Sequence, residues 1–219
     1  MTVSEVLRER SIREVLHFTT NNGIVGTLAK RALMSRFRLP QEAYLRHVLH
    51  VNAASRPEEA AFFDKSQNWL DYVNLSISEI NRRFFLVSQR WHENADVWWG
   101  ILSFDSCIAA HEGVVFASTN NGYPCCIRNP GVEGLKSLFV PVVARKAGWS
   151  VARRHREVHL TTCEQAEILY PRQVSTDLLR AIYVQSETHH DIVQGWLGEF
   201  GFEEVNVQIS PDKFLGRPN

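Results

Sequence analysis

Seven short runs of apolar and β-branched residues are spread along this chain, and each has the length of a β-strand. The runs are 14–17, 72–76, 97–104, 114–117, 167–170, 181–184 and 205–209. Three stretches between them, 24–33, 80–91 and 189–200, carry apolar residues at helical spacing, and Gly201 stands where a C-terminal helix cap is expected. Short strands scattered among amphipathic helices predict a mixed α+β fold.

No internal repeat, low-complexity tract or obvious linker interrupts the 219 residues, so we expect a single domain over residues 1–219. A hydrophobic content of 44% excludes disorder, and no stretch approaches the roughly 20 apolar residues of a membrane span. The first ten residues mix acids and bases, and no secretory signal is visible. We therefore expect a cytoplasmic protein with no membrane partner.

The charge of the chain is neutral in sum but uneven along its length. Its 24 basic and 24 acidic residues cancel, which ordinarily argues against a nucleic-acid partner. The segments 30–50 and 143–159 are nevertheless strongly basic, and the acids gather after residue 187. The basic residues of the second segment are Arg145, Lys146, Arg153, Arg154 and Arg156. The neutrality is thus an average over a polarised molecule.

The segment 119–162, which contains this whole basic cluster, is broken repeatedly by asparagine, glycine and proline. The pattern predicts a long irregular loop just before a strand, and connections of that length usually bind substrate or are disordered. A solvated surface loop with incidental arginines is the alternative.

The sequence His17-Phe18-Thr19, followed by Asn22, is predicted at the end of the first strand, just before a helix. Its ring nitrogens, hydroxyl and amide suit a ribose or a carboxamide. The chain has no Walker or Rossmann glycine pattern, so a nucleotide would bind in another manner. On its own the motif is unspecific, because most such histidines are structural or exposed.

Two acids, Glu164 and Glu167, lead into the predicted strand 167–170. Glu167 lies at the mouth of that strand, where a carboxylate can hold a sugar hydroxyl and stabilise positive charge at an anomeric carbon. Glu164 lies in the preceding loop. An edge acid kept for solubility is the alternative interpretation of Glu167.

Arg56 precedes a proline, and its planar guanidinium suits a diphosphate or a developing anion. It could equally pair with the two glutamates that follow Pro57. The four cysteines show neither a pairing nor a chelating pattern, so we expect no metal.

Five motifs in order resemble the DarT family of DNA ADP-ribosyltransferase toxins, over about residues 16–185. They are His17-Phe18-Thr19, the stretch 71–76 (DYVNLS), the stretch 99–105 (WGILSFD), the stretch 113–116 (GVVF) leading to Asn120-Asn121, and the stretch 165–169 (QAEIL). Each motif alone is unspecific, but five in this order are hard to obtain by chance.

The resemblance implies an ADP-ribosyltransferase-like fold, with a split, bent β-sheet and surrounding helices. It also implies that NAD is the ADP-ribose donor, that the acceptor is a base in single-stranded DNA, and that nicotinamide is released. A toxin of this kind implies a cognate antitoxin that removes ADP-ribose, either a macrodomain or a related hydrolase.

The resemblance further assigns roles to individual positions. Glu167 and Arg56 are expected to be catalytic. The residues expected to bind NAD are His17, Phe18, Thr19, Asn22 and Arg56. Those expected to contact DNA are Asn74, Ser76, Arg145, Lys146, Trp149, Arg153, Arg154 and Arg156, and the segment 119–167 is expected to be the substrate-recognising loop.

The chain departs from the thymine-modifying members at two places. The stretch 74–78 reads NLSIS where those members are often rich in aromatic residues, and Gly23 stands about where they carry an asparagine, the nearest one here being Asn22. These departures favour guanine as the acceptor base. Two alternatives stay open: an NAD-dependent transferase that acts on RNA or protein, and a catalytically silent nucleic-acid-binding module.

Overall fold

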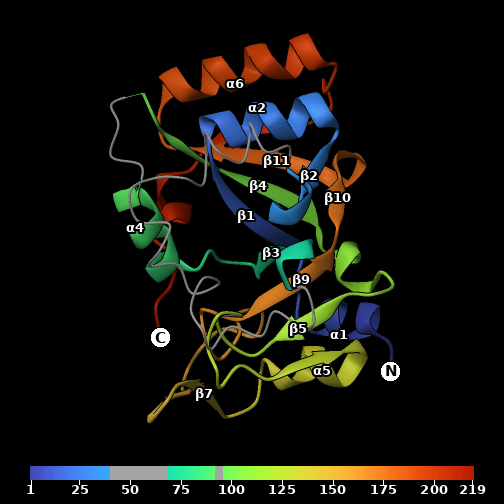
Figure 1. Cartoon of the computed structure of the whole chain (residues 1–219), viewed down its shortest axis with the longest axis vertical. Coiled ribbons are helices and arrows are strands. Elements are labelled where there is room, and N and C mark those ends of the chain that lie inside the picture. Colours follow the sequence, from blue (N-terminus) through green and yellow to red (C-terminus); the bar gives the residue numbers. More distant parts are fainter. Residues whose placement is uncertain (40–68, 92–95) are drawn as a thin grey trace.

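The computed structural model describes residues 1–39, 69–91 and 96–219, which form a mixed sheet flanked by helices (Figure 1). The sheet has the strand order β12-β11-β4-β1-β3-β9-β5-β6. All neighbours pair antiparallel except β11 and β12, which are parallel. Its strands are β1 (Glu14–Thr20), β3 (Tyr72–Ile77), β4 (Trp99–Asp105), β5 (Val115–Ala117), β6 (Arg128–Pro130), β9 (Glu167–Pro171), β11 (Leu179–Val184) and β12 (Asn206–Ile209).

Two small strand pairs and several helices complete the described chain. The pairs are β2 (Ala32–Met34) with β10 (Gln173–Ser175), and β7 (Val142–Lys146) with β8 (Trp149–Ala152). The α-helices are α1 (Val3–Glu9), α2 (Asn21–Lys30), α4 (Arg82–Trp91), α5 (Gly131–Ser137) and α6 (Glu187–Phe200). Short 3₁₀ turns are η1 (Arg36–Arg38), η4 (Trp69–Asp71), η5 (Ser106–Ala110), η6 (Thr176–Leu178) and η7 (Pro211–Phe214). In Figure 1, α2 and α6 lie side by side at the top, and α1 and α5 lie together at the bottom.

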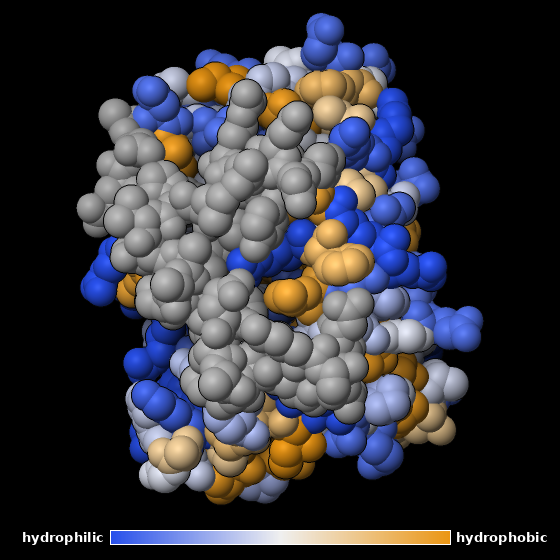
Figure 2. All heavy atoms as spheres, in the orientation of Figure 1, coloured by the Kyte–Doolittle hydropathy of each residue, from blue (hydrophilic) through white to orange (hydrophobic). Residues whose placement is uncertain are grey.

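The two faces of the sheet follow from the alternation of side chains along its central strands. On β4, Leu102 and Phe104 point into the cluster that includes residues of α2 and α6, whereas Ile101 points into a second cluster with Phe85 of α4 and Phe214 of η7. The large apolar side chains of the central strands are thus buried in clusters on both faces of the sheet. Figure 2 shows apolar residues in small groups among hydrophilic ones on the part of this face that the described residues form.

The mixed α+β fold and the seven predicted strands are confirmed, with shifted ends. The three helices are also confirmed, and α6 ends at Gly201 in the left-handed conformation (φ 71°). The predicted range 24–33 lies three residues too late in the chain: α2 begins at Asn21 and ends at Lys30, before β2. No helix in the described ranges is both long and apolar enough to cross a membrane.

The prediction of a long irregular loop over 119–162 is wrong, because this segment contains β6, α5, β7 and β8. Several of the residues read as breakers lie at the ends of these elements. Pro130 caps the start of α5, Gly131 follows it with a positive φ of 68°, and Gly148 (φ 72°) forms the turn between β7 and β8. Glycine and proline here delimit short elements instead of preventing them.

The sheet is split between β1 and β3, as the resemblance implied. β1 pairs with β4 along its whole length, from Glu14 to Thr20. It pairs with β3 only at Val15 and Leu16, opposite Ile77 and Ser76. From His17 onward, the β3-facing edge of β1 therefore has no strand partner in the described part of the chain.

Two glycines in helices provide a test of the packing beside β6. A Cβ atom on Gly134 of α5 would lie 2.1 Å from the carbonyl oxygen of Asn129, whereas a Cβ on Gly198 of α6 meets nothing within 4 Å. We expect Gly134→Ala to lower the free energy of unfolding by about 1–3 kcal/mol, because the helix must move away from the strand. Gly198→Ala should raise it by about 0.5–1 kcal/mol through helix propensity. Chemical denaturation measures both, and equal stability of the two variants would contradict this account of α5.

Candidate active site

Two cavities meet in the cleft that the split opens. The larger, of about 370 Å³, lies among β1, α2 and α4, and the smaller, of about 140 Å³, reaches Glu167. Four side chains line both of them: Arg36, Tyr72, Asn74 and Phe84. The two cavities are therefore neighbouring compartments of one site.

His17 stands where β1 and β3 separate. It lies inside β1 and not at its end, so that part of the sequence prediction is corrected. Its Nδ1 is 2.9 Å from the carbonyl oxygen of Asn74. Because a carbonyl only accepts, Nδ1 carries the proton, and in the neutral ring Nε2 is an acceptor. Burial lowers the pKa of His17 below its ordinary value, opposed by the hydrogen bond to Asn74, and this favours the neutral ring.

The four residues proposed around NAD from the sequence, His17, Phe18, Thr19 and Asn22, all line the larger cavity. Phe18 packs against aromatic rings of α4 and β4, with centroid distances of 5.2 Å to Phe85, 5.8 Å to Trp99 and 5.9 Å to Phe84. These contacts form a firm aromatic wall on one side of the cavity.

Helix α2 begins directly after β1, with no connecting loop. The side chain of Thr20 accepts a hydrogen bond from the Gly23 amide and caps the helix. A Cβ on Gly23 would lie 2.0 Å from Oγ1 of Thr19, so the close approach of strand and helix requires glycine here. The start of α2 is thereby held against the cavity.

Glu167 is the first residue of β9 and only 5% exposed. Its Oε2 accepts hydrogen bonds from the backbone amide of Asn121 at 2.7 Å and from Nδ2 of Asn74 at 3.1 Å. In the register of β3 and β9, Glu167 faces Ser76 and Leu169 faces Asn74, so Asn74 is the diagonal neighbour of Glu167 on the same face. Ser76 is 8% exposed and lines neither cavity.

Glu164, the other acid before β9, has a different role. It is buried and forms ion pairs with Arg145 and with Arg83, whose Nε lies 3.2 Å from its Oε1. It lines neither of the two cavities. Of the two acids, only Glu167 faces the cleft.

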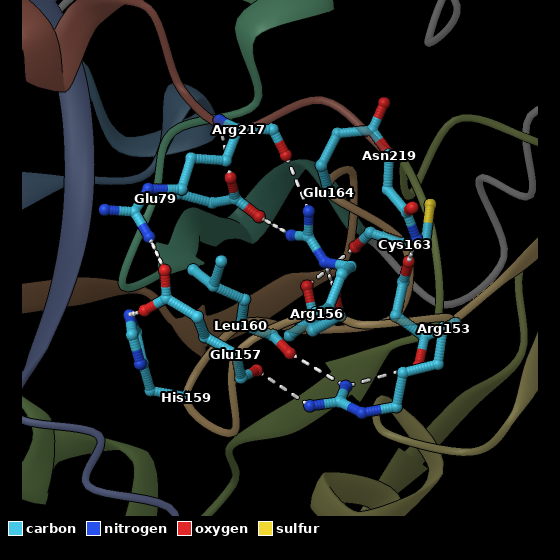
Figure 3. Close-up of polar contacts among 12 residues, drawn as sticks. Glu79, Arg153, Arg156, Glu157, His159, Leu160, Cys163, Glu164, Arg217 and Asn219 are labelled. Atoms are coloured by element: carbon cyan, nitrogen blue, oxygen red, sulfur yellow. Dashed lines mark hydrogen bonds and ion pairs between the residues drawn. The ribbon is translucent and has the colours of Figure 1, made fainter.

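Three arginines that were assigned to DNA contacts hold the loop before Glu167 together, and Figure 3 shows two of them, Arg153 and Arg156. Arg156 pairs with Glu79 and donates to the carbonyl oxygens of Thr161 (2.7 Å) and Arg217 (2.6 Å). Arg153 donates to the carbonyl oxygens of Leu160 and Glu157, both at 2.8 Å.

Arg145, the third of these arginines, is 1% exposed, pairs with Glu164 and donates to Gln165 at 3.3 Å. The structure thus gives Arg145, Arg153 and Arg156 a role inside the fold. Lys146, Trp149 and Arg154 from the same cluster are exposed.

Arg36 is a cleft residue that sequence reasoning included only as part of a basic segment. It lines both cavities from η1. Its neighbour Arg38 donates to both carboxylate oxygens of Asp71, at 2.7 and 2.8 Å, and Ser35 donates to the same group at 2.8 Å. The Arg38 guanidinium holds the pKa of Asp71 below its ordinary value. This ionised clamp fixes η1 and therefore the position of Arg36.

Asn121 and Trp69 also line the smaller cavity; from the sequence, Asn121 was part of one of the five motifs without an assigned role, and Trp69 was a candidate for stacking on a base. The Asn-Asn-Gly turn directly after a strand was the available signal for Asn121. Arg56 lies outside the described residues, so its role stays a prediction. No group of three or more histidine, cysteine, aspartate or glutamate residues able to hold a metal is found within 1–39, 69–91 and 96–219.

Comparison with known structures finds the same fold at low identity. Thermus sp. 2.9 DarT in complex with ADP-ribosylated ssDNA has a TM-score of 0.62 and 16% identity, covering 91% of this chain and 95% of that one. Thermus sp. 2.9 DarT in complex with NAD⁺ has a TM-score of 0.58 and 15% identity, covering 91% and 96%. Thermosipho africanus DarTG in complex with ADP-ribose has a TM-score of 0.62 and 13% identity, covering 94% and 52%, so the present chain spans about half the length of that protein.

Among curated proteins, none matches the chain significantly. Residues 16–215 match the family model described as "ssDNA thymidine ADP-ribosyltransferase, DarT". Since this match extends over nearly all of the 219 residues, the chain belongs to the DarT family.

Proposed function

We propose that this protein transfers ADP-ribose from NAD to a base of single-stranded DNA and releases nicotinamide. The observation that carries the proposal is the pair of joined compartments, with His17, Phe18 and Thr19 in the larger and Glu167 in the smaller. The Thermus relatives in complex with NAD⁺ and with ADP-ribosylated ssDNA support it.

NAD occupies the larger compartment in this proposal. The unpaired edge of β1 offers backbone groups to the carboxamide, in the way that a strand edge pairs with an added segment. Nε2 of His17 accepts from a ribose hydroxyl. Arg36 and Lys30, which both line this compartment, supply positive charge for the diphosphate.

Glu167 acts where the glycosidic bond breaks. As the bond from C1′ to the nicotinamide nitrogen breaks, the electron pair leaves with nicotinamide and positive charge develops on the ribose. The Glu167 carboxylate holds a ribose hydroxyl and offsets that charge. The acceptor base then forms its bond to C1′ and releases a proton to water, so that the products are the ADP-ribosylated base, nicotinamide and one proton.

Arg56 is proposed to orient NAD and the acceptor base and to act electrostatically. Proton acceptance by an arginine is disfavoured, because its pKa keeps it protonated.

The surface proposed for DNA combines Lys146 and Arg154 with Trp149. Trp149 is 47% exposed, and its ring lies under two guanidinium groups, with 4.7 Å to Arg145 and 5.2 Å to Arg83. An exposed indole held in one orientation provides a stacking platform for a base. Asn74 contributes at the junction of the two compartments.

Two other functions remain candidates, but the site favours the transferase over one of them. A catalytically silent binding module gives no reason to bury a carboxylate beside a cavity, where it must be supplied with hydrogen-bond donors. An RNA or protein acceptor is compatible with the same donor site. A toxin role and an antitoxin that removes ADP-ribose, a macrodomain or a related hydrolase, complete the proposal, and the DarTG relative is consistent with it.

The first experiment identifies the base that accepts ADP-ribose. The sequence favours guanine, whereas the matching family model is described by thymidine. After incubation of the wild-type protein with NAD and a mixed-sequence DNA single strand, or with RNA or protein in parallel reactions, digestion of the DNA to nucleosides and mass spectrometry should identify an ADP-ribosylated deoxyguanosine. A thymidine adduct would overturn the guanine prediction and keep the transferase. Modification of RNA or protein alone would support the alternative acceptor, and NAD left intact in every reaction would support the silent module.

Replacing the catalytic carboxylate tests the mechanism. Glu167→Gln keeps the size of the side chain and an oxygen for the Asn121 amide, but removes the negative charge. We expect transfer to fall by at least about 100-fold, because stabilisation of the developing charge is lost. The control is Glu199→Gln, on the exposed side of α6. Activity of Glu167→Gln near the wild-type level would refute the assignment.

The DNA surface makes separable predictions for charge and for stacking. Lys146→Ala with Arg154→Ala should weaken binding and reduce the slope of log K against log salt by up to about 1.4, since each phosphate contact to a single strand contributes about 0.7. Trp149→Ala should weaken binding without changing the slope, because stacking releases no counterions. Fluorescence anisotropy with a labelled strand measures both, and Arg180→Ala on the exposed part of β11 is the control. Unchanged affinity in all variants would exclude this surface.

A further inference from the structure

Arg128, the first residue of β6, holds the turn that contacts Glu167. Its Nε donates to Oδ1 of Asn121 at 2.6 Å, and its Nη2 donates to the backbone carbonyl oxygen of the same residue. Its Nη1 donates to the carbonyl oxygen of Cys126 at 3.2 Å. One planar guanidinium thus fixes both oxygens of Asn121, and this fork geometry is available to arginine and not to lysine.

The sheet register explains why this contact matters for Glu167. Arg128 pairs with Ala117 on β5, and Ala117 pairs with Glu167 on β9. The three residues form one row across three strands, so their side chains share a face of the sheet. Ala117 is small and buried, and the Asn121 turn lies between the two longer side chains.

The backbone amide of Asn121 points at Glu167 because Arg128 holds the two oxygens of Asn121. The amide donates to Oε2 of Glu167 at 2.7 Å. With Oδ1 and the carbonyl oxygen of Asn121 both fixed by Arg128, the peptide plane has little freedom to turn this N–H away.

Arg128 also contacts the wall of the smaller cavity. Its guanidinium lies over the ring of Trp69, 5.1 Å from the ring centroid, and Trp69 lines the compartment that contains Glu167. Within the described ranges Arg128 forms no ion pair, so its charge is not neutralised by a carboxylate contact there. Within these ranges, its guanidinium is therefore held by neutral oxygens and by the face of the Trp69 ring.

We propose that Arg128 is a positioning residue for the transfer reaction: it acts through Asn121 to orient the Glu167 carboxylate towards the ribose. This inference rests on the proposed function, since it assigns Arg128 to the reaction of the same cleft. Arg128 itself lines neither compartment of the cleft.

Kinetics of Arg128→Gln and Arg128→Lys test the proposal. We expect kcat to fall about 10- to 100-fold in Arg128→Gln, with KM for NAD within about threefold of wild type, because a hydrogen bond to a charged group is lost and NAD contacts remain. The acid limb of the pH–rate profile should move to higher pH, since a carboxylate that loses a donor holds its proton more tightly. Arg128→Lys should recover only part of kcat. Arg180→Gln, an exposed arginine at 58% with a single carboxylate partner, is the matched control.

A double-mutant cycle with Asn121→Ala tests the route. Asn121→Ala removes Oδ1 but keeps the backbone amide. If Arg128 acts through Asn121, the double variant should be no slower than Arg128→Gln alone. Multiplying effects would show separate roles and overturn the proposal, as would an Arg128→Gln enzyme with an unchanged kcat and pH profile.

Carboxyl ¹³C NMR provides a readout that does not need turnover. With the Glu167 signal assigned from Glu167→Gln, its titration midpoint should rise in Arg128→Gln and not in Arg180→Gln. If the wild-type protein has no transferase activity but the Glu167 midpoint still rises in Arg128→Gln, the proposed function is wrong and the positioning contact is kept. If the wild-type protein is active but the Glu167 midpoint is the same in Arg128→Gln, the proposed function is kept and the positioning role of Arg128 is wrong. Thermal melting of each variant identifies a loss of fold, for which Arg128→Lys then serves as the milder replacement.

Discussion

The cleft exists because β1 and β3 pair at only two positions and then diverge. β1 can separate from β3 without losing its place, because β4 pairs with all seven of its residues. An open strand edge leaves backbone groups that need partners, and such edges are normally protected or used for binding. His17 spans the opening with its bond to the Asn74 carbonyl, so the strand that forms one wall of the cleft is tied to the strand that positions Glu167.

The second requirement is to keep a carboxylate buried at the end of that cleft. Glu167 receives donors from two directions, Asn74 on β3 and Asn121 in the turn after β5. The loop before it is fixed by carbonyl contacts and by two buried ion pairs, Arg145–Glu164 and Arg156–Glu79, of which Figure 3 shows the second. In both arrangements, polar side chains and backbone groups are buried in order to hold a charged group in place. Such groups need hydrogen-bond or charge partners, because the interior has a low dielectric constant.

Local pattern in the sequence was sufficient for seven strands of the main sheet, for helices α2, α4 and α6, and for the place of Glu167 at a strand entrance, but it missed the short elements between residues 119 and 162. It was insufficient wherever the outcome depends on residues brought together by the sheet. Arg145 and Arg154 look alike in sequence, but one is enclosed by Glu164 and Gln165 while the other is exposed. Arg128 and Glu167 are far apart in the chain, and only the pairing of β6, β5 and β9 places them in one row. Side-chain periodicity determines which residues face inward, and not which inward residues meet.

The places of the basic residues in the fold explain how a chain of zero net charge could bind DNA. Because Arg145, Arg153 and Arg156 are used inside the fold, few cations from that cluster remain for phosphates. Under the proposed function, affinity for DNA then depends on Lys146 and Arg154 together with stacking and with the entry of one base into the compartment of about 140 Å³ beside Glu167. A base held in a duplex would have to leave its stack to reach that depth, at a cost of a few kcal/mol. A single strand avoids most of this cost, so under the proposed function the size of the cavity favours single-stranded over double-stranded DNA.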